Sequence, residues 1–136
     1  MKKYRYLDHT SEVKFQAFGM DLEEAFANAA LAMFNIMVDT EKVRDNIKKE
    51  ISVDGANEKS LLFNFLDELI FLINTEGFLL HKVESLVING SKVKAVLVGD
   101  NISEIYETNN DVKAVTYHDM EINKGDNVVV QVVVDV

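Results

Sequence analysis

Cysteine and proline are both absent from this 136-residue sequence. Without cysteine the chain has no disulfide, no thiolate zinc site and no cysteine nucleophile, so oxygen or imidazole ligands must hold any metal. No apolar run reaches the roughly 18 residues that a membrane-spanning helix needs. The N-terminal MKKYRYLDHT lacks the apolar stretch and cleavage site of a signal peptide. We therefore expect a cytoplasmic protein.

Positive charge is scarce, with 14 Lys and Arg against 23 Asp and Glu and a net charge of -9. Such a chain repels a phosphate backbone at the sequence-independent level where most nucleic-acid affinity arises. Direct binding to RNA or DNA is therefore not expected. A basic protein partner or a divalent cation suits this charge, although an acidic surface also serves solubility alone.

Hydrophobic periodicity predicts two helices. Asp21 is placed to cap the first, over residues 22 to 38, whose apolar stripe is rich in Ala and Met. Asn57 is placed to cap the second, and Gly77 is placed to end it. The second helix is apolar around most of its girth, so it should be covered by other elements or by a partner.

Most of the remaining chain reads as β-strands. Residues 13–18 alternate apolar and polar, a short strand is expected around Ile51 and Val53, and Asn89-Gly90 predicts a hairpin between two further strands. Strands are also expected at VKAVTYH and NVVVQVVVDV. We predict an α+β fold: one two-layer domain over residues 1–136, with both helices packed on one face of a mixed or antiparallel sheet.

The last strand is apolar on both faces, which places it in the middle of a sheet, yet it ends in Asp135 and Val136. If strand 13–18 pairs beside it, the polar loop DHTSE lies at the same edge, bringing Glu12 and Asp8 toward the carboxylates of Asp135 and Val136. Two unit charges about 4 Å apart repel by roughly 4 kcal/mol near a protein surface. Either a hard cation such as Ca²⁺, Mg²⁺ or Mn²⁺ relieves this repulsion, or these acids are merely solvated strand ends.

Five segments together resemble the archease family: YLDHTSEVKFQAFG, DLEEAFANAALAMFNIM, LLFNFLDELIFLINTEG, DVKAVTYHDM and the C-terminal VVVDV. The resemblance spans the whole chain in order. It implies a small acidic protein that activates RtcB-type RNA ligases, which join tRNA exon halves. The implied role is chaperone-like: it promotes guanylylation of the ligase's active-site histidine, so that the ligase turns over repeatedly.

The resemblance also implies site residues. An acid of the N-terminal loop and the last two residues of the family bind a divalent metal, and these positions match Glu12, Asp135 and Val136. The family loop usually reads DHTAD, whereas this one reads DHTSE, which keeps the charge and adds a methylene that calcium coordination tolerates better than magnesium coordination. A lysine implicated in ligase activation matches Lys113, which could also pair with Asp111 as an ordinary surface lysine.

Two other functional classes remain open. Asp8, His9, Glu12 and His118 could form the metal site of a phosphoester hydrolase, although both histidines could also be structural and Asp8 could orient the loop through Asx-type hydrogen bonds. A purely structural binding domain is the third class. It predicts no metal affinity.

Overall fold

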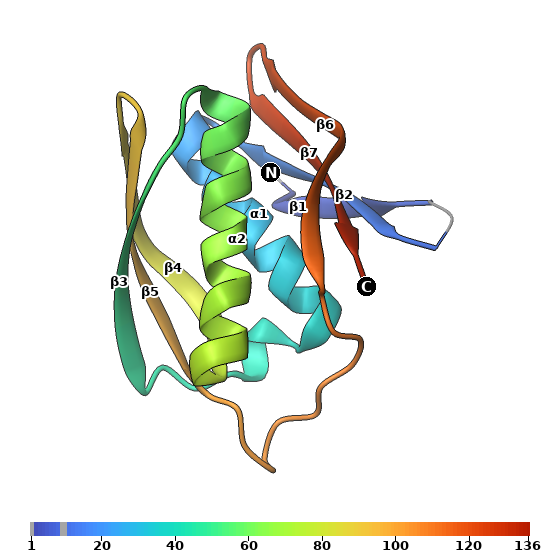
Figure 1. Cartoon of the computed structure of the whole chain (residues 1–136), viewed down its shortest axis with the longest axis vertical. Helices are drawn as coiled ribbons and strands as arrows, with labels where there is room; N and C mark the ends of the chain where they lie inside the picture. The colour runs from blue at the N-terminus through green and yellow to red at the C-terminus, as the bar shows by residue number, and fades with distance from the viewer. Residues whose placement is uncertain (1, 9–10) are drawn as a thin grey trace.

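The computed structural model describes residues 2–8 and 11–136, and it confirms the α+β class with two helices and antiparallel sheets. The strands are divided between two sheets, where we had expected one. The first has the order β1-β2-β7-β6 and the second the order β3-β5-β4. Both helices pack between the two sheets (Figure 1). Periodicity assigns residues to strands but does not say which strands share a sheet, which is why the division was missed.

The two long helices, β2 and β7 lie close to their predicted bounds, whereas β3, β4 and β6 are longer than the strands predicted there. The four-stranded sheet consists of β1 (Tyr4–Leu7), β2 (Val13–Gly19), β6 (Ala114–Lys124) and β7 (Val128–Asp135). The three-stranded sheet consists of β3 (Ile47–Asp54), β4 (Phe78–Asn89) and β5 (Lys92–Asn101). The helices are α1 (Leu22–Met37), α2 (Glu58–Glu76) and the short 3₁₀ helix η1 (Thr40–Lys42).

The predicted helix ends are confirmed. The Asp21 side chain accepts a hydrogen bond from the Glu24 backbone N–H, and Asn57 and Ser60 form a reciprocal capping box at the start of α2. Gly77 ends α2 in the left-handed conformation at φ 66°, where a residue without Cβ is not strained. These local signals explain why both helices could be located from sequence.

The main hydrophobic core joins both sheets through the helices, and a small second cluster consists of Val38, Val43, Leu79 and Tyr106. The fully buried aromatic side chains of the main core include Phe15 of β2, Phe26 and Phe34 of α1, Phe65 of α2 and Phe78 of β4. Because α2 contacts strands of both sheets, it buries most of its circumference, which accounts for its nearly all-round apolar sequence. One exposed strip is left on α2, which carries Asp67 and Phe71.

The central position predicted for the last strand is confirmed. Strand β7 pairs with β2 on one side and with β6 on the other, both antiparallel. Val130, Val132 and Val134 on its core face are fully buried, and so is Val133 on its opposite face. The pairing with β2 is the one on which the predicted acidic edge depended. No helix in the described part of the chain is long and apolar enough to span a membrane.

Candidate functional site

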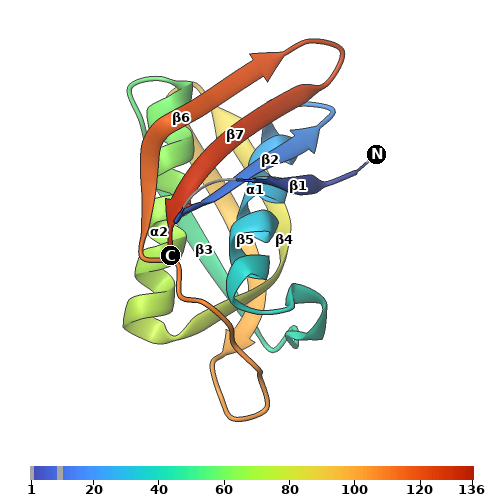
Figure 2. The same ribbon diagram turned by 90° about the vertical axis from the view of Figure 1, so that its right-hand side faces the viewer.

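Three segments that are distant in sequence meet at the carboxyl end of β7. In β2, Val13 lies opposite Val134, so Glu12 directly precedes the paired region on one side of Asp135. In β6, Ala114 lies opposite Asp135, so Lys113 directly precedes the paired region on the other side. Figure 2 shows β2 and β6 beginning on either side of the end of β7. We call Glu12, Lys113, Asp135 and Val136 the sheet-edge site.

The centre of this site is held in place by the main chain. The backbone N–H of Lys113 donates to the carbonyl oxygen of Asp135 over 2.8 Å, which extends the β6–β7 pairing to the last residues. Asp135 and Val136 are both half-buried, and the Val136 side chain packs against the hydrophobic core. The backbone that carries the oxygen atoms of Asp135 and Val136 is therefore held in place by the sheet and the core.

The N-terminal loop reaches the same edge. Leu7 of β1 pairs with Lys14 of β2, so Asp8 and Glu12 both lie just beyond the last pair of this hairpin. Asp8 is exposed and Glu12 is half-buried. Ser11 has φ 60°, a left-handed conformation that non-glycine residues seldom adopt. His9 lies outside the described residues, and its predicted role is not addressed by the structure.

Lys113 is exposed at the site. No ion pair joins Lys113 and Asp111 in the described chain, and whether Lys113 is an ordinary surface lysine is a question for mutagenesis. The loop before Lys113 is anchored by Tyr106, whose hydroxyl donates to Asp100 and accepts from the backbone N–H of Arg44 over 3.1 Å. The hydrogen bond from Tyr106 lowers the pKa of Asp100, whereas burial and this same bond raise the pKa of Tyr106.

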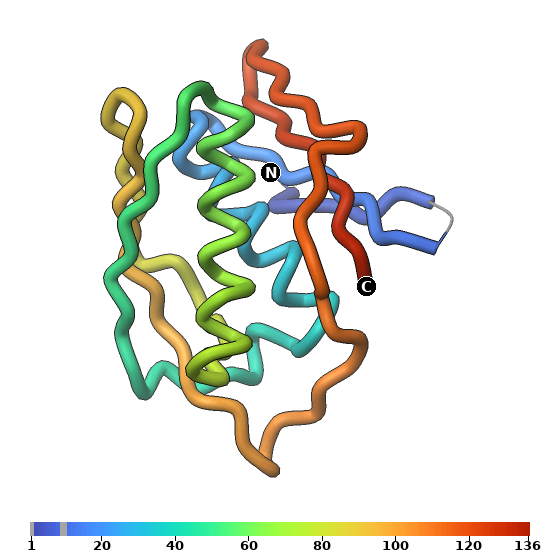
Figure 3. Tube along the Cα trace, in the orientation of Figure 1, coloured from blue at the N-terminus to red at the C-terminus, as the bar shows by residue number. Residues whose placement is uncertain are grey.

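His118 lies in a bulge of β6. The register passes from Thr116 opposite Val133 to Glu121 opposite Gln131, so residues 117–120 face a single residue of β7. Figure 3 shows the trace of β6 leaving the line of the strand there. Asp119, at φ 52°, accepts from Lys14 Nζ over 3.2 Å and lies 3.4 Å from His118 Nε2. Sequence reasoning missed this group because alternation does not indicate a bulge.

A buried glutamine holds the bulge against the sheet. Gln131 Nε2 donates to the backbone oxygen of Asp119 over 2.9 Å and to Glu121 Oε2 over 2.8 Å, while its Oε1 accepts from Gln16 over 2.9 Å. The amide thus satisfies its hydrogen-bonding capacity at a buried position. The bulge is a fixed part of the fold.

The described members of the predicted hydrolase site, Asp8, Glu12 and His118, form no three-residue metal group, and His9 lies outside the described residues. Within residues 2–8 and 11–136 no three His, Asp or Glu side chains lie together in a way that could hold a metal, and this includes Asp8, Glu12 and His118. A metal site made from only two acidic side chains together with main-chain oxygens is not a group of this kind, so the absence of a three-residue group does not argue against it. Glu12, Asp135 and the main-chain oxygens of Val136 supply the hard oxygen donors that Ca²⁺, Mg²⁺ and Mn²⁺ prefer, so the donor chemistry fits such a cation.

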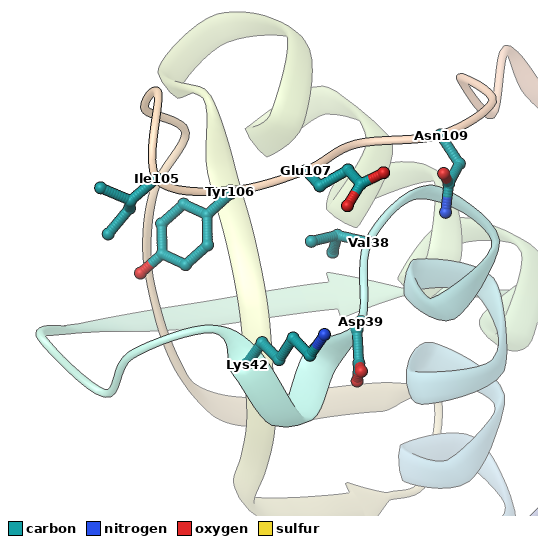
Figure 4. A pocket seen from close by; sticks show the side chains of 7 residues that line it. All are labelled: Val38, Asp39, Lys42, Ile105, Tyr106, Glu107 and Asn109. Carbon is teal, nitrogen blue, oxygen red and sulfur yellow. The ribbon is translucent and has the colours of Figure 1, made fainter.

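The molecule also has a polar pocket away from the sheet-edge site. It has a volume of about 360 Å³ and is lined by residues of η1 and its flanks and by the β5–β6 loop: Val38, Asp39, Lys42, Ile105, Tyr106, Glu107 and Asn109 (Figure 4). It contains none of the site residues predicted from sequence. The opposed charges of Lys42 and of Asp39 and Glu107 select no single class of ligand.

Comparison with known proteins agrees with this architecture. The model of the archease protein family matches residues 4–136. The chain belongs to the archease family. Protein archease of Pyrobaculum islandicum is 43% identical over 141 residues, covering 98% of this chain and 95% of the relative. Protein archease of Methanosarcina barkeri is 37% identical over 141 residues, covering 99% and 97%.

Two solved structures share this fold over all or nearly all of the chain. The solution structure of a Methanobacterium thermoautotrophicum protein has a TM-score of 0.84 at 34% identity and covers 100% of both chains. A Thermotoga maritima crystal structure, described as an archease and possible chaperone, has a TM-score of 0.64 at 19% identity and covers 96% of this chain and 94% of that one. At that identity the second likeness concerns the fold alone.

Proposed function

We propose that this archease is a non-enzymatic, cytoplasmic activator of an RtcB-type RNA ligase and that it acts through the sheet-edge site. The observation that carries the proposal is the meeting of Glu12, Lys113, Asp135 and Val136 at one end of β7, although they come from three separate segments. Membership of the archease family supports the same function.

In this proposal Glu12, Asp135 and Val136 hold a divalent cation. The bound cation supplies positive charge and Lewis acidity where the two proteins meet. A cation held by both carboxylates would offset the repulsion that two negative groups at one site exert on each other. Their position on an ordered sheet edge orients them before the partner arrives.

Lys113 has a separate task. The residue directly precedes β6, on the opposite side of β7 from Glu12, and is exposed. There it can position a phosphate of the guanine nucleotide or a carboxylate of the ligase. The backbone hydrogen bond from Lys113 to Asp135 fixes the position of the Lys113 backbone relative to that of Asp135. Catalysis itself remains with the ligase.

The experiment is multiple-turnover RNA ligation by a small amount of the ligase, with wild type, Glu12→Ala and Asp135→Ala. Asp126→Ala is the matched control, because Asp126 is an exposed acid in the β6–β7 turn at the other end of these strands. We expect wild type and Asp126→Ala to restore turnover and both site variants to fail while remaining folded. If wild type leaves turnover unchanged, the proposal is wrong, and hydrolysis of a generic phosphoester, with and without His118→Ala, is then the assay to run.

A further inference from the structure

We infer that the exposed strip of α2, together with Tyr117 of β6, is a docking surface for a basic and partly apolar segment of a partner protein. We call Phe63, Asp67, Phe71 and Tyr117 the α2 surface. The inference rests on the proposed function, since the same partner is taken to reach both this surface and the sheet-edge site. It adds a second contact that binds the partner without taking part in activation.

The first observation is an aromatic stack at the surface. The rings of Phe63 and Tyr117 are parallel within 7°, with centroids 4.3 Å apart. Tyr117 nevertheless remains 53% exposed, and because Phe63 covers one face of its ring, that exposure belongs to the other face and the edge. An exposed tyrosine face held rigid by a neighbour is a platform for a guanidinium or ammonium group.

The second observation is an apolar anchor on the same helix. Phe71 is 56% exposed and follows Phe63 by two helical turns, with the exposed Asp67 between them. Positions four apart share one side of a helix, so the three residues form one strip. In Figure 1 no described element lies between α2 and the viewer, so one side of the helix is not covered by the rest of the described chain.

The charge around this strip selects the partner. From Ser60 to the end of α2 there is no basic residue, and the 102–112 loop, whose start is bonded to Gly77 at the end of α2, also has none. Asp67 and Glu68 of the helix are in no ion pair of the described chain. Lys59, which directly precedes Ser60, lines a pocket with Tyr117, so the acidic part of the strip is its centre at Asp67 and Glu68. An aromatic strip with unpaired acids at its centre complements Arg or Lys side chains flanked by aliphatic ones.

The surface adjoins the sheet-edge site. Lys113 directly precedes β6, and Tyr117 is the fourth residue of that strand. One partner can therefore contact both residues. Tyrosine at the centre of a contact commonly carries a large share of binding energy. The α2 surface is therefore expected to set affinity, while the sheet-edge site sets activation.

The test measures binding of labelled ligase separately from turnover. Phe71→Ser, Tyr117→Ala and Asp67→Lys should each raise Kd about tenfold or more, with turnover recovered at saturating protein. Glu12→Ala should bind within a few-fold of wild type and fail to activate. Val87→Ser on the outer side of β4 and Asp126→Lys are matched controls, because Val87 is 55% exposed and Asp126 is an exposed acid.

Normal binding by all three surface variants, with Glu12→Ala still inactive, would overturn the docking surface and leave the proposed function standing. If wild type neither binds nor activates the ligase, the proposed function fails, and a second probe decides about the surface. A synthetic peptide of alternating Arg and Leu is titrated into ¹⁵N-labelled protein. Shifts centred on residues 63–71 and Tyr117 support the surface, whereas shifts absent there or equally large around Val87 overturn it.

A second copy of this chain is the competing occupant. Sedimentation velocity of wild type and Phe71→Ser decides this point. A single monomeric species for both is the expected result. Self-association that Phe71→Ser abolishes would assign the α2 surface to a homodimer and overturn the inference.

Discussion

The backbone N–H of Lys113 donates to the carbonyl oxygen of Asp135 over 2.8 Å, so two residues 22 positions apart in the chain are joined at the sheet edge. Val13 opposite Val134 brings Glu12 to the same place from the other side. Backbone pairing alone thus assembles the sheet-edge site. Its three segments cannot separate unless the sheet opens at this end.

Divalent metal binding should depend on both acids. We expect Glu12→Ala and Asp135→Ala each to lower the affinity for Ca²⁺ by about tenfold or more, because each removes a charged oxygen ligand. Isothermal titration calorimetry measures this directly, with Mg²⁺ and Mn²⁺ titrated in parallel. Asp126→Ala should bind as wild type does. Unchanged affinity in both site variants would place the metal elsewhere or remove it from the proposal.

Lys113→Ala should reduce activation of the ligase and leave metal affinity and folding almost unchanged. The reason is that the structural link to Asp135 is made by the backbone N–H, which alanine retains, whereas the ammonium group is lost. Ligation turnover and thermal unfolding are the two measurements. Lys94→Ala, which removes an exposed lysine from β5, is the control. Full activity of Lys113→Ala would make this residue an ordinary surface lysine.

Tyr106→Phe should change how the stability of the protein depends on pH, because it changes the pKa of Asp100. The Tyr106 hydroxyl is the main cause that lowers the pKa of Asp100, so its removal should raise that pKa toward the ordinary aspartate value. A carboxyl group with a lowered folded-state pKa contributes stability above its unfolded pKa and loses it as the pH falls. The variant should therefore lose less stability than wild type on acidification below about pH 4.

Carboxyl ¹³C NMR titration of Asp100 in wild type and Tyr106→Phe gives the pKa directly. Tyr106→Phe should also change the stability of the protein at alkaline pH. Wild-type Tyr106 has a raised pKa, so it contributes stability that is complete below the unfolded tyrosine value and lost as pH rises through the folded value. The Tyr106→Phe variant has no phenol at this position, so it should not lose this stability as the pH rises. An Asp100 pKa that does not move would contradict the hydrogen bond as its cause.

Gly99→Ala should be strongly destabilising. A Cβ at Gly99 in the central strand β5 would lie 1.9 Å from the carbonyl oxygen of Leu79, a main-chain atom that cannot move aside cheaply. We expect a loss of about 3 kcal/mol or more in the free energy of unfolding, measured by urea denaturation. Gly125→Ala is the control, since its Cβ would meet only the Asn127 oxygen at 3.9 Å. Similar midpoints for the two variants would contradict the close approach.

Local signals explain what could be predicted. Asp21, Asn57 and Gly77 act on backbone groups within a few residues, so the ends of both helices were readable from sequence. The Asn89-Gly90 hairpin is confirmed for the same reason, with Gly90 at φ 61°. The strand around Ile51 is longer than expected, since β3 extends from Ile47 to Asp54. Lys48, Glu50 and Asp54 are exposed on one face, but Lys49 lies on the half-buried face with the apolar residues and interrupts the alternation.

The amino-acid sequence by itself determined the two helices, most of the strands, the central place of β7 and, through its family resemblance, membership of the archease family. These follow from periodicity, capping and composition, which act locally or are shared among relatives. Only the tertiary structure decided the division into two sheets, the bulge that holds Asp119 to Lys14, and the stack of Phe63 on Tyr117. Each of these depends on which distant segments pair, and that choice is made by the packing of the whole core.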